Sequence, residues 1–232
     1  MPLEIVGGSS GSGGGGSSAF DPTTTCRVYE DYLSVAVFTP FNSGAGAAQA
    51  QNAGQLTPDR PGQLRQLTGT TATGVCNSYC IQPIEHGKGF TYKSALLLLQ
   101  LSTGSEEFET ITGLVADVVA GRSTNGIYFL YDRAVLGANW HCVTDDDTGT
   151  TTTDSGVAAD TAFNDFEIVM SAGYDSCVFS INGAVVATHT TVANFPDVND
   201  RGYPQTKIQK SVGTTGVFQY IDYQLLDYTV DR

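Results

Sequence analysis

The segment CVFSINGAVVATHTT, residues 177–191, is the strongest indication of the fold, because Asn182-Gly183 stands between two apolar runs. A two-residue Asn-Gly connection is the strongest short-range signal for a β-hairpin, since both residues tolerate the positive φ of a type I′ turn. Just upstream, residues 166–171 alternate, with Phe166, Ile168 and Met170 on one face. These patterns predict neighbouring antiparallel strands.

Short β-branched and aromatic runs, separated by Gly, Asn, Asp and Thr, continue on both sides of this hairpin. Asn125-Gly126 repeats the turn dipeptide, and residues 92–101 and 110–119 read as buried strands. Within the first of these, residues 95–99 show no alternation and fit either a central strand or a buried helix; the surrounding pattern favours a strand. Residues 43–55 read as an Ala/Gly/Gln loop. The sequence predicts an all-β protein, an antiparallel two-sheet β-sandwich.

The order of these pieces resembles the concanavalin A-like (lectin/glucanase) modules of tailed-phage virion proteins. The residues that carry the resemblance are Pro61-Gly62-Gln63-Leu64, residues 67–74, Asn125-Gly126-Ile127-Tyr128-Phe129, Trp140, Phe179-Ser180-Ile181-Asn182-Gly183, and Gly213-Thr214-Thr215 ahead of Ile221-Asp222-Tyr223. The resemblance implies a jelly roll and a virion setting. It implies no activity, because this fold carries lectins, hydrolases and structural modules alike.

The N-terminal residues differ in composition from the rest of the chain. Residues 7–18 read GGSSGSGGGGSS, which cannot bury enough apolar surface to order itself. We therefore expect an extended, flexible Gly/Ser-rich arm at residues 1–19 and a β-sandwich domain at residues 20–232, with its core module from about residue 60. Leu3, Ile5 and Val6 are the expected anchors of the arm, adding a strand to a partner's sheet edge.

Charge and hydropathy exclude several classes of partner. The net charge is -13, and no cluster of Lys and Arg is present, so neither nucleic acid nor an anionic membrane is an expected partner. The apolar residues 95–101 are too few to cross a bilayer. Residues 1–6 lack the basic start of a signal peptide. These features predict a protein assembled in a host cytoplasm.

Metal and cofactor sites are not expected. The five cysteines could be zinc ligands, disulfide partners or buried thiols, and the absence of ligands near Cys76 and Cys80 other than His86 favours reduced, structural thiols. Residues 144–156 read as an acidic loop or hairpin tip. Counted from Asp145, this stretch lacks the Gly and the acidic residue of an EF-hand, so a solvated loop is favoured, while calcium binding at residues 145–147 stays open.

Catalytic residues are not expected either. The glucanases of this fold carry a Glu-x-Asp-x-x-Glu pattern, and the nearest candidate here, Glu107-Phe108-Glu109, has Thr112 in the last position. The three histidines fit structural positions. Three aromatic residues could form a sugar-stacking platform, although a core position is favoured for them; they are Trp140, Tyr128 and Tyr131.

The sequence therefore predicts a non-enzymatic structural virion protein of a tailed phage, a capsid decoration or cement protein. It would lie on the virion surface and bind the major capsid protein and copies of itself, as a dimer or trimer, through its arm and a sheet surface. A carbohydrate-binding module of a tail fibre or host-recognition protein, with a glycan as partner, is the alternative. A glycosidase-like enzyme is the third possibility.

Overall fold

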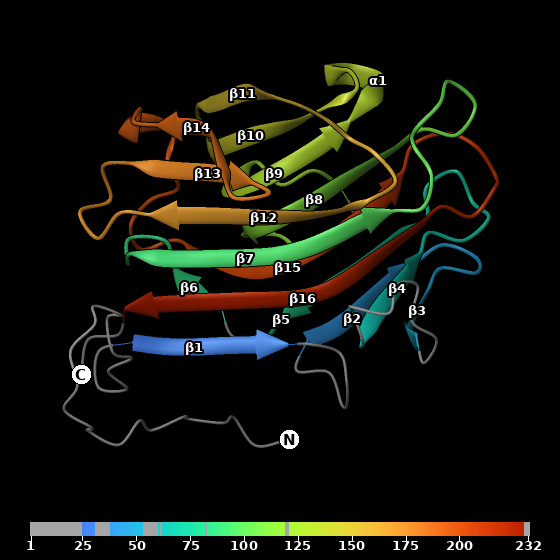
Figure 1. Ribbon diagram of the computed structural model, residues 1–232, viewed down its shortest axis with the longest axis horizontal. Helices are drawn as coiled ribbons and strands as arrows, with labels where there is room; N and C mark the ends of the chain where they lie inside the picture. Colours follow the sequence, from blue (N-terminus) through green and yellow to red (C-terminus); the bar gives the residue numbers. More distant parts are fainter. Residues whose placement is uncertain are drawn as a thin grey trace.

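The computed structural model describes residues 25–30, 38–52, 60, 62–81, 83–118 and 121–229. These residues form two packed antiparallel sheets of eight strands each, with sheet A in front and sheet B behind it in Figure 1. Every strand pair is antiparallel. The predicted β-sandwich is confirmed. The expected arm, residues 1–19, with its anchors Leu3, Ile5 and Val6, lies outside the described residues.

Both sheets are assembled from strands that are distant in sequence. Sheet A contains, in spatial order, β14 (Ala184–His189), β13 (Cys177–Ile181), β12 (Phe163–Met170), β7 (Phe90–Leu98), β16 (Phe218–Thr229), β4 (Gln63–Leu67) and β3 (Ala48–Asn52), with β1 (Thr25–Glu30) also paired to β16. Sheet B contains β11 (Thr150–Ala158), β10 (Asn139–Asp146), β9 (Asn125–Asp132), β8 (Phe108–Val115), β15 (Arg201–Lys210), β5 (Val75–Cys80) and β2 (Phe38–Ser43), with β6 (Ile84–Glu85) paired to β15. Two short helices, α1 (Arg133–Leu136) and η1 (Val192–Asn194), join strands. No described helix is long and apolar enough to span a membrane.

The core lies between the sheets, because alternate residues of each strand point inward. Aromatic rings dominate one half of it. The Phe129 ring lies 4.9 Å from Phe166 and 5.3 Å from Phe179, and Trp140 lies 4.7 Å from Phe166. These edge and tilted contacts join β9 and β10 of sheet B to β12 and β13 of sheet A, and so hold the two layers together.

The predicted hairpin is present between β13 and β14. Asn182 and Gly183 have φ angles of +52° and +78°, as a type I′ turn requires. The Asn182 side chain also fastens the turn to β12: its Oδ1 accepts a hydrogen bond from the Asp165 N–H at 2.9 Å, and its Nδ2 donates to Asn164 Oδ1 at 2.9 Å.

Gly183→Val should lower the free energy of unfolding by about 1–2 kcal/mol, because a β-branched residue resists positive φ. A Cβ at Gly183 would meet no atom within 4 Å, so backbone conformation alone should set the cost. Urea unfolding measures it. An unfolding free energy equal to that of the parent would show that the turn tolerates L-residues.

Several boundaries differ from the predictions. Residues 48–52, predicted as loop, form β3, because they pair with β4 in sheet A. The strand predicted at residues 110–119 ends at Val115. Asn125-Gly126 begins β9 and pairs with β8 and β10, so it is no turn. The acidic segment, residues 144–156, contains the end of β10, a tip at residues 147–149 and most of β11.

Candidate functional site

The outer face of sheet B, which points away from the core, is covered by the chain itself. The covering segment, residues 116–118 and 121–124, follows β8 and leads into β9. Side chains of β5 and β15 bind its backbone. Asn77 Nδ2 donates to the Val118 carbonyl at 2.8 Å, and Gln205 Nε2 donates to the Asp117 carbonyl at 2.8 Å.

Two further residues of β15 bind the same segment at Gly121. The Gly121 N–H donates to Gln209 Oε1 at 2.6 Å, and Lys207 Nζ donates to the Gly121 carbonyl. Lys207 is only 1 % exposed, and burial lowers the pKa of its ammonium group. A buried cation on the outside of a sheet is explained by this cover, which supplies a carbonyl partner and excludes water.

Apolar side chains on the same face are buried beneath the covering segment and α1. This second cluster contains Ile111, Val115, Tyr128, Leu130 and Val143, with Leu136 of α1 packed against it. The Tyr128 hydroxyl donates to the Ser123 carbonyl at 3.2 Å. The outer face of sheet B is therefore packed like an interior surface where these strands cross.

The three candidate platform aromatics do not form a shared exposed surface. Tyr128 lies under the covering segment at 0 % exposure. Tyr131 and Trp140 point into the core, each 1 % exposed, with ring centroids 5.7 Å apart. Tyr131 and Trp140 thus lie between the sheets, whereas Tyr128 belongs to the second cluster on the outer face of sheet B.

The carboxylates near the glucanase-like pattern lie on the outer face of sheet B. Glu109 on β8 is directly opposite Asp132 on β9. Arg122 Nη2 lies 3.0 Å from Glu109 Oε2 and also contacts Asp132. Thr112 points the other way, into the interior, where its Oγ1 lies 2.8 Å from the Tyr92 hydroxyl. Glu109 and Thr112 therefore cannot share one cleft, and Arg122 is shared as an ion-pair partner by Glu109 and Asp132.

The Gly213-Thr214-Thr215 stretch, part of the sequence resemblance, holds a carboxylate in place. Glu106 Oε1 accepts hydrogen bonds from the N–H groups of Thr214 and Thr215, at 3.2 and 3.0 Å. Its Oε2 lies 3.3 Å from Lys210 Nζ, whose side chain is fully buried. These contacts join the β15–β16 connection to the residues before β8. The motif therefore has a structural role.

The acidic tip between β10 and β11 is organised by its own backbone. Asp146 Oδ1 accepts from the N–H groups of Thr148 and Gly149, at 2.9 and 2.6 Å. Burial, together with the charges of Asp147 and Asp146, raises the pKa of Asp145. Among the described residues, no three or more His, Cys, Asp or Glu side chains gather in a way that could hold a metal ion.

His86 is a fully buried histidine beside the strand pair β6–β15. Its Nδ1 lies 3.1 Å from the Asp200 carbonyl. Burial lowers its pKa to about 4, against the opposing effect of the Asp200 carbonyl. The ring is therefore neutral near pH 7 and fills space against Gly202, where a Cβ would come within 2.4 Å of Nε2.

Acidification should destabilise the protein through His86. The unfolded histidine takes up a proton near pH 6.5, whereas the folded one does so only near pH 4, so this stabilisation is complete above pH 6.5 and is lost as pH falls toward 4. The difference corresponds to about 3 kcal/mol. In urea unfolding, the stability gap between the parent and His86→Gln should narrow by about that amount between neutral and acidic pH. An unchanged gap would contradict this assignment.

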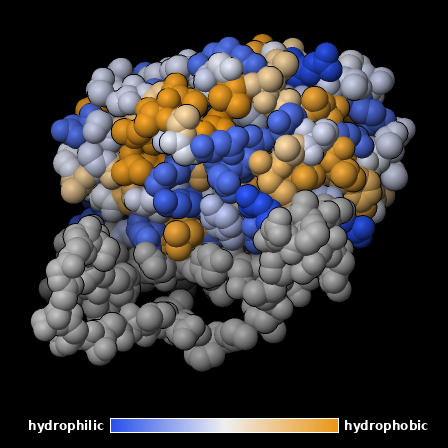
Figure 2. All heavy atoms as spheres, in the orientation of Figure 1, coloured by the Kyte–Doolittle hydropathy of each residue, from blue (hydrophilic) through white to orange (hydrophobic). Residues whose placement is uncertain are grey.

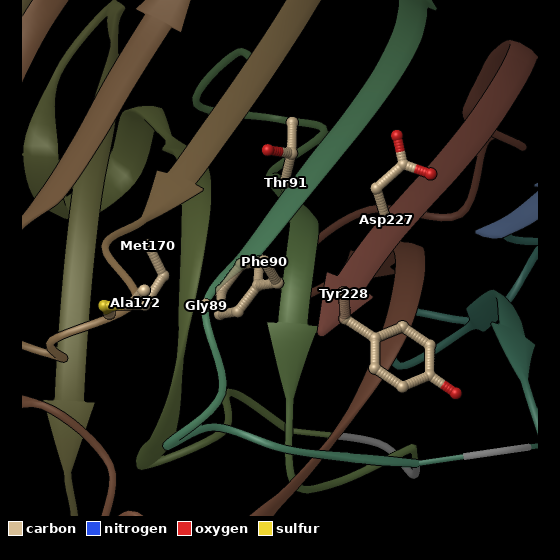
Figure 3. A pocket seen from close by; sticks show the side chains of 7 residues that line it. All are labelled: Gly89, Phe90, Thr91, Met170, Ala172, Asp227 and Tyr228. Carbon is tan, nitrogen blue, oxygen red and sulfur yellow. The ribbon is translucent and has the colours of Figure 1, made fainter. Parts of the chain in front are cut away.

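A pocket opens at one end of sheet A, where β7 begins and β12 and β16 end. Its volume is about 270 Å³, and it is lined by Gly89, Phe90, Thr91, Met170, Ala172, Asp227 and Tyr228. Figure 3 shows the side chains of Thr91 and Asp227 projecting from neighbouring strands, with Phe90 and Tyr228 beside them. The register agrees, since Thr91 faces Asp227 and Phe90 faces Tyr228 across the β7–β16 pair.

This pocket combines apolar and polar groups. Phe90 and Met170 belong to the core cluster, and Tyr228 packs against it. Thr91 and Asp227 supply a hydroxyl and a carboxylate at the rim. Sequence reasoning missed the site, because three segments far apart in the chain build it and none carries a motif.

Solved structures share this fold. A protein of unknown function from Shewanella oneidensis aligns with a TM-score of 0.66 at 14% identity, covering 90% of this chain and 88% of its own. Peanut lectin aligns at 0.59 and 9% identity (90% and 99% covered), and a Bacillus licheniformis β-glucanase at 0.55 and 12% (88% and 98% covered). The fold is the concanavalin A-like jelly roll of lectins and glucanases. No family model and no curated protein matches the sequence. None of these comparisons points to a virion protein.

Proposed function

We propose that this protein is a non-enzymatic carbohydrate-binding module and that its sugar site is the pocket between β7, β12 and β16. Sugars present apolar ring faces beside pairs of hydroxyl groups, and they bind where aromatic or aliphatic surface adjoins hydrogen-bonding side chains. The half-buried Tyr228 ring supplies the first at the end of β16, and Thr91 and Asp227 supply the second on the outer face of the sheet. Phe90 and Met170, at 3 % and 2 % exposure, form the floor. This combination, in a fold shared with a lectin and a glucanase, carries the proposal.

The size of the pocket suits a short ligand. At about 270 Å³ it is smaller than the usual drug-sized cavity, which favours one sugar ring over a long buried chain. Asp227 would accept hydrogen bonds from sugar hydroxyls, and charged acceptors bind more strongly than neutral ones. Thr91 would donate to or accept from the same ring.

The proposal excludes hydrolysis because the outer-face carboxylates are already engaged. A glycosidase places one carboxyl as acid and another as base or nucleophile on either side of a sugar bond. Here Arg122 joins Glu109 and Asp132, and the covering segment occupies the space over the neighbouring strands.

A glycan array tests the proposal, with a reducing-end assay on every glycan that binds. We expect binding to a defined set of glycans without release of reducing ends. Failure to bind any glycan would overturn the binding role. Turnover that is lost in Glu109→Gln would overturn the non-enzymatic assignment.

A second candidate is a capsid decoration or cement protein of a tailed phage. The sequence resemblance favours it, and so does an apolar area on the outer face of sheet A. Figure 2 shows apolar residues gathered over β12–β14. Val169 and Val185 are 36% and 65% exposed there, and Val178 on β13 is directly opposite Val169. Such a patch suits contact with another subunit or a shell protein. Leu3, Ile5 and Val6 remain the proposed anchors to the major capsid protein.

Counting copies in purified particles tests this second candidate. Many copies per head would support decoration, and few copies at a tail would support glycan recognition. Deleting residues 1–18 should reduce incorporation into particles while leaving thermal unfolding unchanged, because residues 7–18 contain no core-forming side chains. Incorporation at parental occupancy would contradict the anchoring role.

A further inference from the structure

Two cysteines in the core belong to opposite sheets. Cys142 is on β10 of sheet B and Cys177 is on β13 of sheet A. Both are 0 % exposed, belong to the same core cluster and carry free thiols. Each lies one strand in from the same edge of the sandwich, since β11 and β14 are the edge strands there.

One contact between the sheets lies on the edge side of the two thiols. Thr153 on β11 is directly opposite Cys142, and His189 on β14 is directly opposite Cys177. His189 Nε2 and Thr153 Oγ1 are 3.0 Å apart. The cross-strand neighbours of the two cysteines therefore touch each other across the sandwich.

A second contact lies on the inner side. Phe129 on β9 is the other cross-strand neighbour of Cys142. Phe179 follows Cys177 by two residues and points into the same core, and its ring centroid lies 5.3 Å from that of Phe129. Cys142 and Cys177 thus lie in the same part of the core, between two direct contacts of the sheets.

We propose that Cys142 and Cys177 form a disulfide that joins sheet A to sheet B when the chain folds in the presence of a low-molecular-weight disulfide such as oxidised glutathione. One thiolate attacks the glutathione disulfide and releases one glutathione thiol. The second thiolate then attacks the mixed disulfide and releases the other. Two protons and two electrons leave the protein, and one glutathione disulfide is reduced to two thiols. The proposal is independent of the proposed carbohydrate site.

Closing the bond requires sheets A and B to approach each other at β10 and β13. Stacked sheets lie about 10 Å apart, whereas a disulfide needs Cα atoms within about 7 Å. The edge strands β11 and β14 come within 8 Å of each other, so the close approach must extend by one strand in each sheet to reach β10 and β13. Burial raises the pKa of Cys142 to about 12, and burial with the nearby Cys142 raises that of Cys177. Thiolates are therefore scarce in the folded core, so oxidation should precede its closure.

Refolding under redox control tests the proposal. The full chain is unfolded in urea with a reductant and refolded either with reduced glutathione alone or with a mixture of oxidised and reduced glutathione. Free thiols are then blocked with N-ethylmaleimide. The oxidised sample should be lighter by two hydrogen atoms before blocking, and a non-reducing digest should contain a Cys142–Cys177 peptide pair. The melting temperature of the oxidised protein should exceed that of the reduced protein by about 5–10 °C.

Cys76→Ala/Cys80→Ala is the matched control, since it keeps the proposed pair while removing two other buried thiols. It should retain the peptide pair, whereas Cys142→Ala and Cys177→Ala should lose it. Peptide mapping of the parent decides the outcome even where a core variant folds poorly. Full blocking of Cys142 and Cys177 after oxidative refolding would overturn the proposal, as would a disulfide between any other pair.

Discussion

Gly113→Ala is expected to lower the free energy of unfolding by about 3 kcal/mol or more, the largest single-residue effect on stability that we anticipate. Gly113 lies on β8 opposite Tyr128, on the outer face of sheet B. A Cβ there would come within 2.4 Å of the Ile127 carbonyl oxygen and 2.6 Å of the Tyr128 Cα. These are backbone atoms of the adjoining strand, so no rotamer change relieves the collision. Relief would separate β8 from β9, next to Tyr128 and the covering segment.

Gly104→Ala is the matched control for this variant. A Cβ at Gly104 meets no atom within 4 Å, and the residue lies in the exposed connection between β7 and β8. Its unfolding free energy should stay within about 0.5 kcal/mol of the parent. Urea unfolding of both variants, followed by fluorescence and by circular dichroism, measures the difference. Equal stability of the two variants would contradict the close pairing of β8 and β9.

Asp227→Ala is expected to weaken glycan binding by about 10- to 100-fold, because a hydrogen bond to a charged group contributes about 1.5–3 kcal/mol. Asp227 projects from β16 beside Thr91, and no other carboxylate lines the pocket as described. The measurement is calorimetric titration with a glycan selected on the array. Melting temperatures of parent and variant, measured in parallel, separate a loss of binding from a loss of folding.

Asp197→Ala provides the control for charge. Asp197 is exposed before β15 and does not line the pocket, yet its loss changes the net charge by the same amount. It should bind the glycan as the parent does. If both variants lost affinity equally, a general electrostatic effect would explain the result. If neither did, the sugar site would lie elsewhere.

Local pattern was sufficient to predict the strands and the hairpin at Asn182-Gly183. The alternation of apolar and polar residues alone predicts that Phe166, Ile168 and Met170 share the buried face of a strand. The positive φ angles of the turn likewise depend only on the two residues Asn182 and Gly183. The strand β3 was missed because its alternating Ala and Gln have weak strand preference. It forms because β4 offers a pairing edge, which is a tertiary effect.

The surroundings of the candidate site could not be predicted, for a different reason. The covering segment has no apolar periodicity, and its partners Asn77, Gln205 and Lys207 come from strands far away in sequence. Nothing in a run of Gln and Lys residues indicates that they bind a backbone. In the same way, Thr91 and Asp227 become neighbours only through the β7–β16 pairing. Both the partners of the covering segment and the Thr91–Asp227 pair therefore depend on the pairing of strands that are distant in sequence.

The residues that carry the sequence resemblance have structural roles in this fold. Trp140 is in the core, Asn182-Gly183 forms a turn, and Thr214 and Thr215 hold Glu106. Each stabilises the sandwich, and none of these three groups lines the pocket. A sequence resemblance that consists of such residues therefore indicates the jelly-roll fold. It does not indicate the biological role, which needs a separate test.

Mapping of a bound glycan by amide chemical-shift perturbation tests whether the pocket between β7, β12 and β16 is the sugar site. With the backbone amides assigned, a glycan selected on the array is titrated into the full chain. We expect the largest shifts on residues 89–91, 170–172 and 227–228, at the pocket, and no change on residues 205–209 under the covering segment. Shifts confined to the outer face of sheet B, with an unperturbed pocket, would contradict it.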